Sequence, residues 1–258
     1  MSRTEAELRL FCLPHAGGGG AFFHPWRAAL APGVEVRPVV LPGRESRIRE
    51  LPYVTMEQAI GPLAELLAPR LDRPYALFGH SMGAAVCYEL ARRFVALGLP
   101  APVRLFVSAR RAPHLPARRA SYARLDDEAF LAEVSRLNGT PSDVLEQPDL
   151  VRLFLPTLRA DFELNDSYTP LPGPRLDCPV SAFVGRDDPE ADTAELKAWA
   201  QVTAGAFRFR AFDGDHFYLK DHAAGLLDEI RTDLDLRPPA STNRRSTNPQ
   251  LPTEGVSR

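Results

Sequence analysis

The stretch that most constrains this chain is a Gly-x-Ser-x-Gly pentapeptide at residues 79–83. The short apolar run before it, residues 75–78, is typical of a buried strand, and residues 84–97 have the apolar spacing of a helix. A turn this tight needs minimal side chains two positions before and two positions after the serine. It presents the Ser81 hydroxyl at the start of a helix, where free N–H groups favour developing negative charge. We therefore predict a nucleophile elbow; the alternative is a glycine-rich turn without chemistry.

Strand and helix patterns alternate along most of the chain. The expected strands are residues 8–13, 34–41, 75–78, 103–108, 180–184 and 207–212. Helical patterns lie between or after them, at residues 21–30, 55–67, 84–97, 191–203 and 223–234. This alternation predicts an α/β fold with a mostly parallel central sheet flanked by helices. At 258 residues, we expect one large domain over residues 1–236.

Two regions break the alternation. Residues 111–178 show helical patterns and no clear strand, with helices expected at residues 126–137 and at residues 148–168, the latter split near Pro156. A helical insertion of this size between sheet strands predicts a lid, although helices packed statically on the domain would give the same pattern. Residues 237–258 mix Pro, Ser, Thr, Asn and Arg without apolar periodicity, so we expect a disordered tail.

Composition excludes several classes of function. A net charge of −2 gives no strong attraction to nucleic acid or to an anionic membrane. No apolar run approaches the ~18 residues of a membrane span, and the first residues lack the apolar core of a secretory signal. Three widely spaced cysteines favour buried thiols in a reducing cytosol. We expect a cytoplasmic monomer that needs no cofactor and no metal ion.

A serine hydroxyl needs a base to accept its proton and an acid to orient that base. After an elbow, these follow in the order acid and then histidine, each at the end of a strand. The strand at residues 180–184 is followed by Asp187 and Asp188, and the strand at residues 207–212 is followed by His216. We predict Ser81 as nucleophile, His216 as base and one of the two aspartates as acid. We favour Asp188, but the pattern alone leaves Asp187 open.

An oxyanion hole requires two backbone donors. One is expected at Met82, the residue after the nucleophile, and the other at Ala16, in the glycine-rich loop that follows the first strand. A phosphate-binding loop fits this segment poorly because Phe22 stands where a third glycine is due and no Gly-Lys-Ser/Thr is present. The residues expected to contact the substrate are His15, Phe130, Phe154 and Phe162.

Several segments together resemble one family. They are Leu-Pro-His-Ala-Gly-Gly at residues 13–18, Leu-Pro-Gly-Arg at 41–44, the elbow at 78–84, Ser-Ala-Arg-Arg-Ala-Pro at 108–113 and Gly-Asp-His-Phe at 214–217. Residues 137–141 and 158–162 in the expected lid resemble it too. In this order the segments resemble the type II thioesterases of polyketide and nonribosomal peptide synthesis, which are stand-alone α/β-hydrolases. The resemblance covers about residues 8–236.

The resemblance implies further assignments. In that family the acid stands three residues after the glycine that ends its strand, which here is Asp188. The family favours glycine where this chain has Asp215. The implied substrate is an acyl group on the phosphopantetheine arm of an acyl or peptidyl carrier protein. This chain lacks a Gly-x-Asp-Ser-Leu attachment site, so the carrier would be a separate partner.

Three other functions fit the same sequence. The first two are a product-releasing thioesterase and a small-ester carboxylesterase of the same fold. The third belongs to another class, a non-catalytic ligand-binding protein on the hydrolase fold.

Arginines gather in two expected loop regions near strand ends. One group is Arg44, Arg47 and Arg49; the other is Arg110, Arg111, Arg118 and Arg119. Either group would suit an acidic carrier face and speed association at low salt. Ordinary solvated arginines would give the same pattern, so both interpretations stay open.

Overall fold

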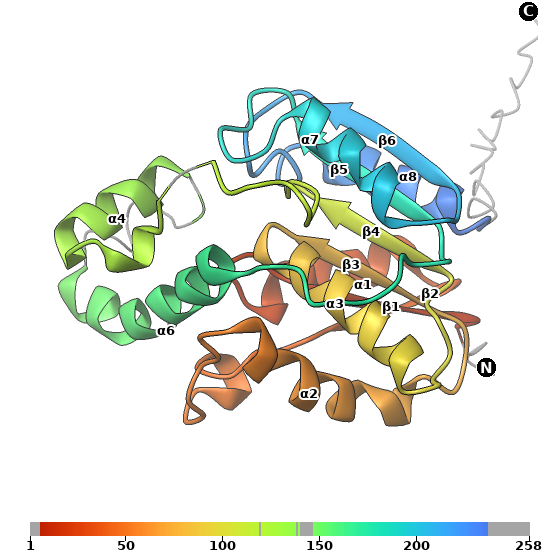
Figure 1. The fold of residues 1–258 in the computed structure, drawn as a ribbon, viewed down its shortest axis with the longest axis horizontal. Coiled ribbons are helices and arrows are strands. Elements are labelled where there is room, and N and C mark those ends of the chain that lie inside the picture. The colour runs from red at the N-terminus through yellow and green to blue at the C-terminus, as the bar shows by residue number, and fades with distance from the viewer. Residues whose placement is uncertain (1–5, 119, 138, 140–146, 237–258) are drawn as a thin grey trace, which may run out of the picture.

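The computed structural model describes residues 6–118, 120–137, 139 and 147–236 (Figure 1). Within them, a six-stranded sheet has the order β2-β1-β3-β4-β5-β6, and every neighbouring pair is parallel. The strands are β1 (Leu8–Leu13), β2 (Val34–Pro38), β3 (Tyr75–His80), β4 (Arg104–Ser108), β5 (Val180–Gly185) and β6 (Phe207–Phe212). The expected parallel sheet is confirmed, with β2 ending three residues earlier than predicted.

Helices cover both faces of the sheet (Figure 1). One layer consists of α1 (His24–Leu30) and α8 (Ala223–Asp233); the other consists of α2 (Met56–Leu67), α3 (Met82–Ala96) and α7 (Thr193–Lys197). Side chains alternate between these layers along each strand. Leu10 and Cys12 of β1 pack toward α1 and α8, whereas Phe11 and Leu13 pack toward α2 and α3. Both faces of the sheet are thereby buried, as parallel sheets require.

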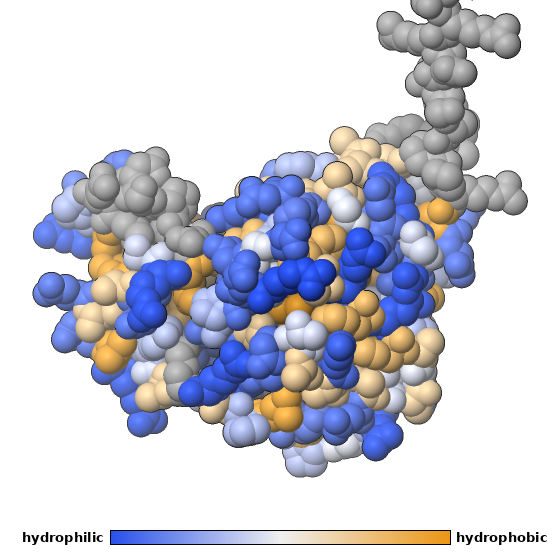
Figure 2. Space-filling view, turned by 90° about the horizontal axis from the view of Figure 1, so that it is seen from above, coloured by the Kyte–Doolittle hydropathy of each residue, from blue (hydrophilic) through white to orange (hydrophobic). Residues whose placement is uncertain are grey.

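The segment between β4 and β5 forms a separate helical lobe. It contains a 3-10 turn (Tyr122–Arg124), α4 (Asp127–Arg136) and α6 (Pro148–Ser167), and it projects to the left in Figures 1 and 2. The lobe has a small core of its own, composed of Phe130, Val134, Leu158 and Phe162. In the described part of residues 111–178 no strand forms, as expected. Movement of this lobe as a lid stays a prediction.

The expected split of the second lid helix near Pro156 is wrong, because α6 runs without interruption from Pro148 to Ser167. A proline inside a helix removes one backbone donor and crowds the preceding turn. Apolar residues on both sides of Pro156, among them Phe154 and Leu158, pack into the lobe core and hold the two halves in one helix.

Two further expectations concern the C-terminal tail and membrane-spanning helices. The predicted disordered tail, residues 237–258, lies outside the described residues. None of the helices in the described ranges combines the length and the apolar character needed to cross a membrane.

Candidate active site

The pentapeptide forms the predicted elbow. Ser81 joins β3 to α3 with φ +55° and ψ −118°, a conformation that non-glycine residues rarely adopt outside functional sites. Its N–H donates to the carbonyl of Ser108 at 2.8 Å. A Cβ at Gly79 would lie 2.2 Å from the carbonyl oxygen of Gly83, and a Cβ at Gly83 would lie 2.3 Å from that of Leu13. Both glycines are therefore required by backbone contacts.

A buried aspartate and a histidine meet beyond the ends of β5 and β6. Nδ1 of His216 lies 3.0 Å from both carboxylate oxygens of Asp188, and the two side chains are only 4% and 0% exposed. Oδ1 of Asp188 also accepts the N–H groups of Glu190 (2.8 Å) and Ala191 (3.3 Å). Asp187 is exposed. Of the two neighbouring acids, the structure turns Asp188 inward toward the histidine.

Ser81 and His216 line the same small cavity, of about 30 Å³. Ala16 forms part of its wall, while Val134 and Phe162 close it from the helical lobe. The structure thus brings together three sequence segments that the elbow motif predicted to converge. The volume accommodates about one water-sized group, so the pocket holds a reacting centre and not a whole ligand.

The two expected oxyanion donors stand in suitable backbone positions. Met82 is the first residue of α3, so its N–H has no acceptor within the helix. In the glycine loop, Gly17 N–H donates to Asp161 and Gly18 N–H donates to the carbonyl of His15. Ala16 lies between β1 and these two amides, and it faces the cavity that Ser81 also lines. Its role as a donor stays a prediction.

A larger cavity of about 690 Å³ adjoins the small one and shares His15, Ala16 and Leu158 with it. Phe154 lines the larger cavity and Phe162 the smaller one, and their contact with a substrate stays a prediction. Phe130 lines neither. It is fully buried in the lobe core, 5.3 Å from the ring of Phe162, so it supports Phe162 from behind. The expected contact between Phe130 and a substrate has no support in this geometry.

His15 and His80 lie beside the proposed base, and the ring centroids of His80 and His216 are 5.2 Å apart. His80 is fully buried, and its Nδ1 lies 2.9 Å from the hydroxyl oxygen of Ser108. Burial lowers the pKa of His80 well below its usual value. His15 is half-buried with its Nδ1 enclosed, and burial lowers its pKa to about 3. Both rings therefore stay neutral at physiological pH.

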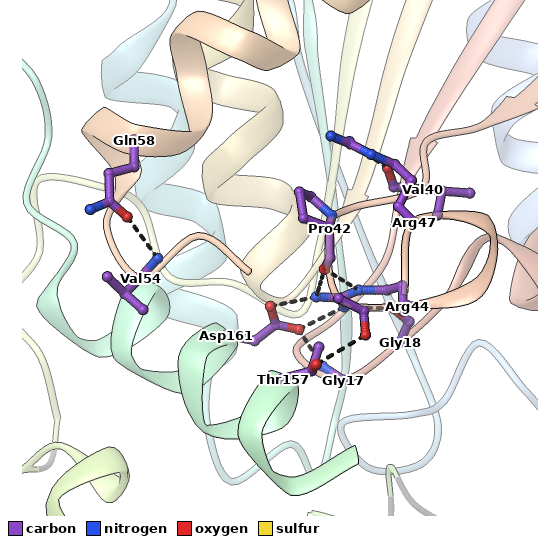
Figure 3. A network of polar contacts seen from close by, with 11 residues as sticks. Gly17, Gly18, Val40, Pro42, Arg44, Arg47, Val54, Gln58, Thr157 and Asp161 are labelled. Atoms are coloured by element: carbon purple, nitrogen blue, oxygen red, sulfur yellow. Dashed lines mark hydrogen bonds and ion pairs between the residues drawn. The ribbon is translucent and has the colours of Figure 1, made fainter. Parts of the chain in front are cut away.

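The sequence analysis missed a buried ion pair. The guanidinium of Arg44 binds both oxygens of Asp161 at 2.7 Å, and Asp161 also accepts the N–H of Gly17 at 2.7 Å (Figure 3). A signal was present, because Asp161 shares the inner face of α6 with Leu158, three residues earlier. A carboxylate on a buried helix face needs a cation, since an isolated buried charge is strongly unfavourable.

The arginine groups considered for docking are largely engaged within the chain. Arg44 is buried, Arg110 is buried and donates to Asn165, and Arg118 pairs with Asp192 and Glu195. Of the remaining members, Arg47 pairs with Glu50, and Arg111 also has an interaction partner. Arg49 is exposed, and Arg119 lies outside the described residues. Among the described members, Arg44, Arg47, Arg110 and Arg118 are therefore not free to form a solvated basic face.

Asp215, which stands where the resembling family favours glycine, acts within its own turn. Its carboxylate accepts the N–H of Phe217 at 2.7 Å, and its carbonyl accepts the N–H of Tyr218 at 3.1 Å. These are the bonds of a turn-forming aspartate. They shape the loop that presents His216 to Asp188.

The parallel sheet, the elbow after β3 and the His–Asp pair after β5 and β6 have the arrangement of an α/β-hydrolase. A family model of the thioesterase domain matches residues 8–234. The gramicidin S biosynthesis protein GrsT of Aneurinibacillus migulanus is 41% identical over 216 residues, or 84% of each chain. Thioesterase PikA5 of Streptomyces venezuelae is 39% identical over 231 residues, or 89% of this chain and 82% of the relative.

Solved structures agree with the sequence matches. The structure of RedJ, a thioesterase from the prodiginine biosynthetic pathway in Streptomyces coelicolor, has a TM-score of 0.84 and 42% identity, covering 90% of this chain and 92% of that one. The chain belongs to the thioesterase family, and the resemblance noted from its motifs is confirmed.

The elbow geometry predicts opposite outcomes for two glycine substitutions. Gly83→Ala forces a Cβ against the Leu13 carbonyl, so we expect at least a 100-fold loss of esterase turnover, or loss of folded protein. Gly225→Ala, inside α8 with Cε1 of Phe212 at an ordinary contact distance of 3.4 Å from the added Cβ, should stabilise the fold by up to about 1 kcal/mol. Activity assays and thermal melts of both variants check this. An active Gly83→Ala enzyme would contradict the elbow packing.

The low pKa of His15 predicts a pH-dependent loss of stability. In the unfolded chain a histidine titrates near pH 6.5, whereas folded His15 binds a proton only near pH 3. As the pH falls below ~6.5, the unfolded state gains a proton that the folded state does not, so the free energy of unfolding decreases until about pH 3. His15→Gln should reduce the drop in unfolding free energy between pH 7 and pH 4, measured by urea titration. Identical drops in both proteins would refute this assignment.

Proposed function

We propose that this protein is a stand-alone type II thioesterase that hydrolyses acyl thioesters on the phosphopantetheine arms of separate carrier proteins. The observation that carries the proposal is the buried His216–Asp188 pair in the pocket that Ser81 lines, at an elbow that only glycine permits. Relatives of similar length, whose names assign them to gramicidin S biosynthesis and to thioesterase activity, support the substrate class.

The chemistry proceeds in two halves. His216 accepts the proton of the Ser81 hydroxyl while Oγ attacks the thioester carbonyl carbon. The resulting oxyanion is bound by the N–H groups of Ala16 and Met82. Collapse breaks the C–S bond, and His216 returns the proton to the leaving thiolate. Water then attacks acyl-Ser81, again with His216 as base, and releases the carboxylic acid and the free serine.

Asp188 performs its part through the imidazole. Its carboxylate accepts a hydrogen bond from Nδ1–H of His216, which leaves Nε2 free to take the proton of Ser81 and stabilises the imidazolium that forms. The bonds from Glu190 and Ala191 hold the carboxylate in place, so the imidazole is oriented before substrate binds.

The larger cavity is the proposed site for the acyl chain or the pantetheine arm. Its volume of about 690 Å³ lies within the usual range of small-molecule sites, and apolar side chains such as Phe22, Phe154 and Leu158 line it. Such a chamber favours flexible apolar chains over charged ligands. We retain the expectation that Phe154, His15 and Phe162 contact the substrate, because all three line the two cavities.

The direct test is mass spectrometry of a carrier protein loaded with several acyl groups, with and without the enzyme. We expect the loss of the acyl mass and recovery of the free thiol form of the carrier. Ser81→Ala should lower turnover about 10⁴-fold or more. Faster hydrolysis of a matched oxygen ester than of the acyl carrier would favour the carboxylesterase alternative. Binding without turnover by the wild-type protein would favour a non-catalytic role.

The two neighbouring aspartates give a matched pair of variants. Asp188→Asn removes the carboxylate that orients His216, so we expect kcat to fall about 10³- to 10⁴-fold. Asp187→Asn changes an exposed side chain and should leave kcat near that of the wild type. Steady-state kinetics with a small acyl thioester measure both. Equal losses in the two variants would contradict the assignment of the acid to Asp188.

A further inference from the structure

One face of α6 is fastened to the body of the protein at three successive turns. Oγ1 of Thr157 donates to the carbonyl of Gly43 at 3.0 Å, Asp161 pairs with Arg44, and Oδ1 of Asn165 accepts from Arg110 at 2.6 Å. Residues four apart lie on the same side of a helix, so these contacts form one continuous polar seam. The lobe that closes the small cavity is therefore anchored to the body along α6.

The middle contact of this seam is the most enclosed. The side chains of Asp161 and Arg44 are 3% and 9% exposed, and both carboxylate oxygens accept from the guanidinium at 2.7 Å (Figure 3). Arg44 also donates to the carbonyls of Gly18 (2.9 Å) and Pro42 (3.3 Å). A buried ion pair adds little to stability compared with apolar residues of similar volume. Stability alone therefore does not account for it.

The second acceptor function of Asp161 points to its role. Its Oδ2 receives the N–H of Gly17 at 2.7 Å, and Gly17 directly follows Ala16 in the glycine loop. The Gly17 N–H belongs to the same rigid peptide plane as the Ala16 carbonyl, so fixing one fixes the other. Gly17 has φ +76°, and a Cβ on it would lie 2.5 Å from Cδ1 of Leu158. Helix α6 thus holds this peptide by a hydrogen bond and by direct packing.

We propose that Asp161, oriented by Arg44, is a positioning residue for the oxyanion hole. It touches no reacting atom. It fixes the peptide that follows Ala16 and thereby aims the Ala16 N–H into the pocket of Ser81. Oxyanion donors act only within a narrow distance range, so a small rotation of this loop weakens the transition state more than the bound substrate. This inference rests on the proposed thioesterase function and assigns part of the positioning of its oxyanion hole to α6.

The test uses the full chain and three variants. Arg44→Met combined with Asp161→Leu removes both buried charges together, so no unpaired charge remains and the fold is expected to persist. Asp161→Asn keeps an oxygen that can accept the Gly17 N–H. Asn165→Leu is the matched control, because it breaks the next contact of the same seam without touching the glycine loop. Circular dichroism shows whether each variant is folded. Titration with a serine-reactive phosphonate measures the fraction of each variant that has a reactive Ser81.

For a small acyl thioester, we expect the double variant to lose about 10- to 100-fold in kcat with KM changed less than about 3-fold. Asp161→Asn should lose less than the double variant, and Asn165→Leu should stay within about 2-fold of the wild type. A rise in KM with unchanged kcat would mean that the pair only shapes the cavity. That result, or an equal loss in Asn165→Leu, would overturn the proposal.

A transition-state analogue gives the second readout. A trifluoromethyl ketone analogue of an acyl pantetheine forms a tetrahedral oxyanion adduct on the nucleophile, so its affinity reports on the oxyanion hole. Across the variants, the inhibition constant of this analogue should rise in proportion to the fall in kcat/KM. An inhibition constant equal to that of the wild type would overturn the proposal. Wild-type and Ser81→Ala turnover are measured first. Turnover that survives Ser81→Ala would refute the proposed function itself, a result distinct from any pattern among the Asp161 variants.

Discussion

The near-contact between the start of α3 and the end of β1 is the constraint on which the site depends. There is no room for a Cβ at Gly83 because the Leu13 carbonyl stands where that atom would be. Since β1 and β3 are parallel neighbours in the sheet, the loops after them emerge side by side. The same contact, between Gly83 and the Leu13 carbonyl, therefore positions both Ser81, the proposed nucleophile, and the glycine loop. Any shift of either loop changes the distance between Ser81 and the proposed oxyanion donors.

Much of this arrangement could be predicted from the sequence, because it follows from local patterns and from topology. The elbow is encoded in five consecutive residues, and His216 and the two aspartates follow strands whose carboxyl ends must meet at one edge of a parallel sheet. The pattern could not separate Asp187 from Asp188. That choice depends on the turn after β5, in which the N–H groups of Glu190 and Ala191 hold Asp188 inward.

Long-range pairing is what the sequence could not disclose. Arg44 pairs with Asp161 across 117 positions, and Arg118 pairs with Glu195 across 77. The place of Asp161 on the inner face of α6 indicates a buried carboxylate, but no nearby pattern identifies the arginine that pairs with it. Phe130 shows the same limit for apolar residues. Its spacing in α4 predicts that it faces inward, but not that the inward side is the lobe core rather than the substrate cavity.

The anchored helix has a consequence for how the proposed substrate, a tethered acyl group, would reach Ser81. Lifting α6 would break the seam at Thr157, Asp161 and Asn165 and would release the glycine loop from Asp161. The larger cavity offers another route, because Ile48 and Leu153 on its wall are 51% and 66% exposed, so it already opens to solvent beside α6. Entry from that side leaves every contact of the seam intact. A flexible chain can therefore approach Ser81 through this opening while the backbone donors stay in position.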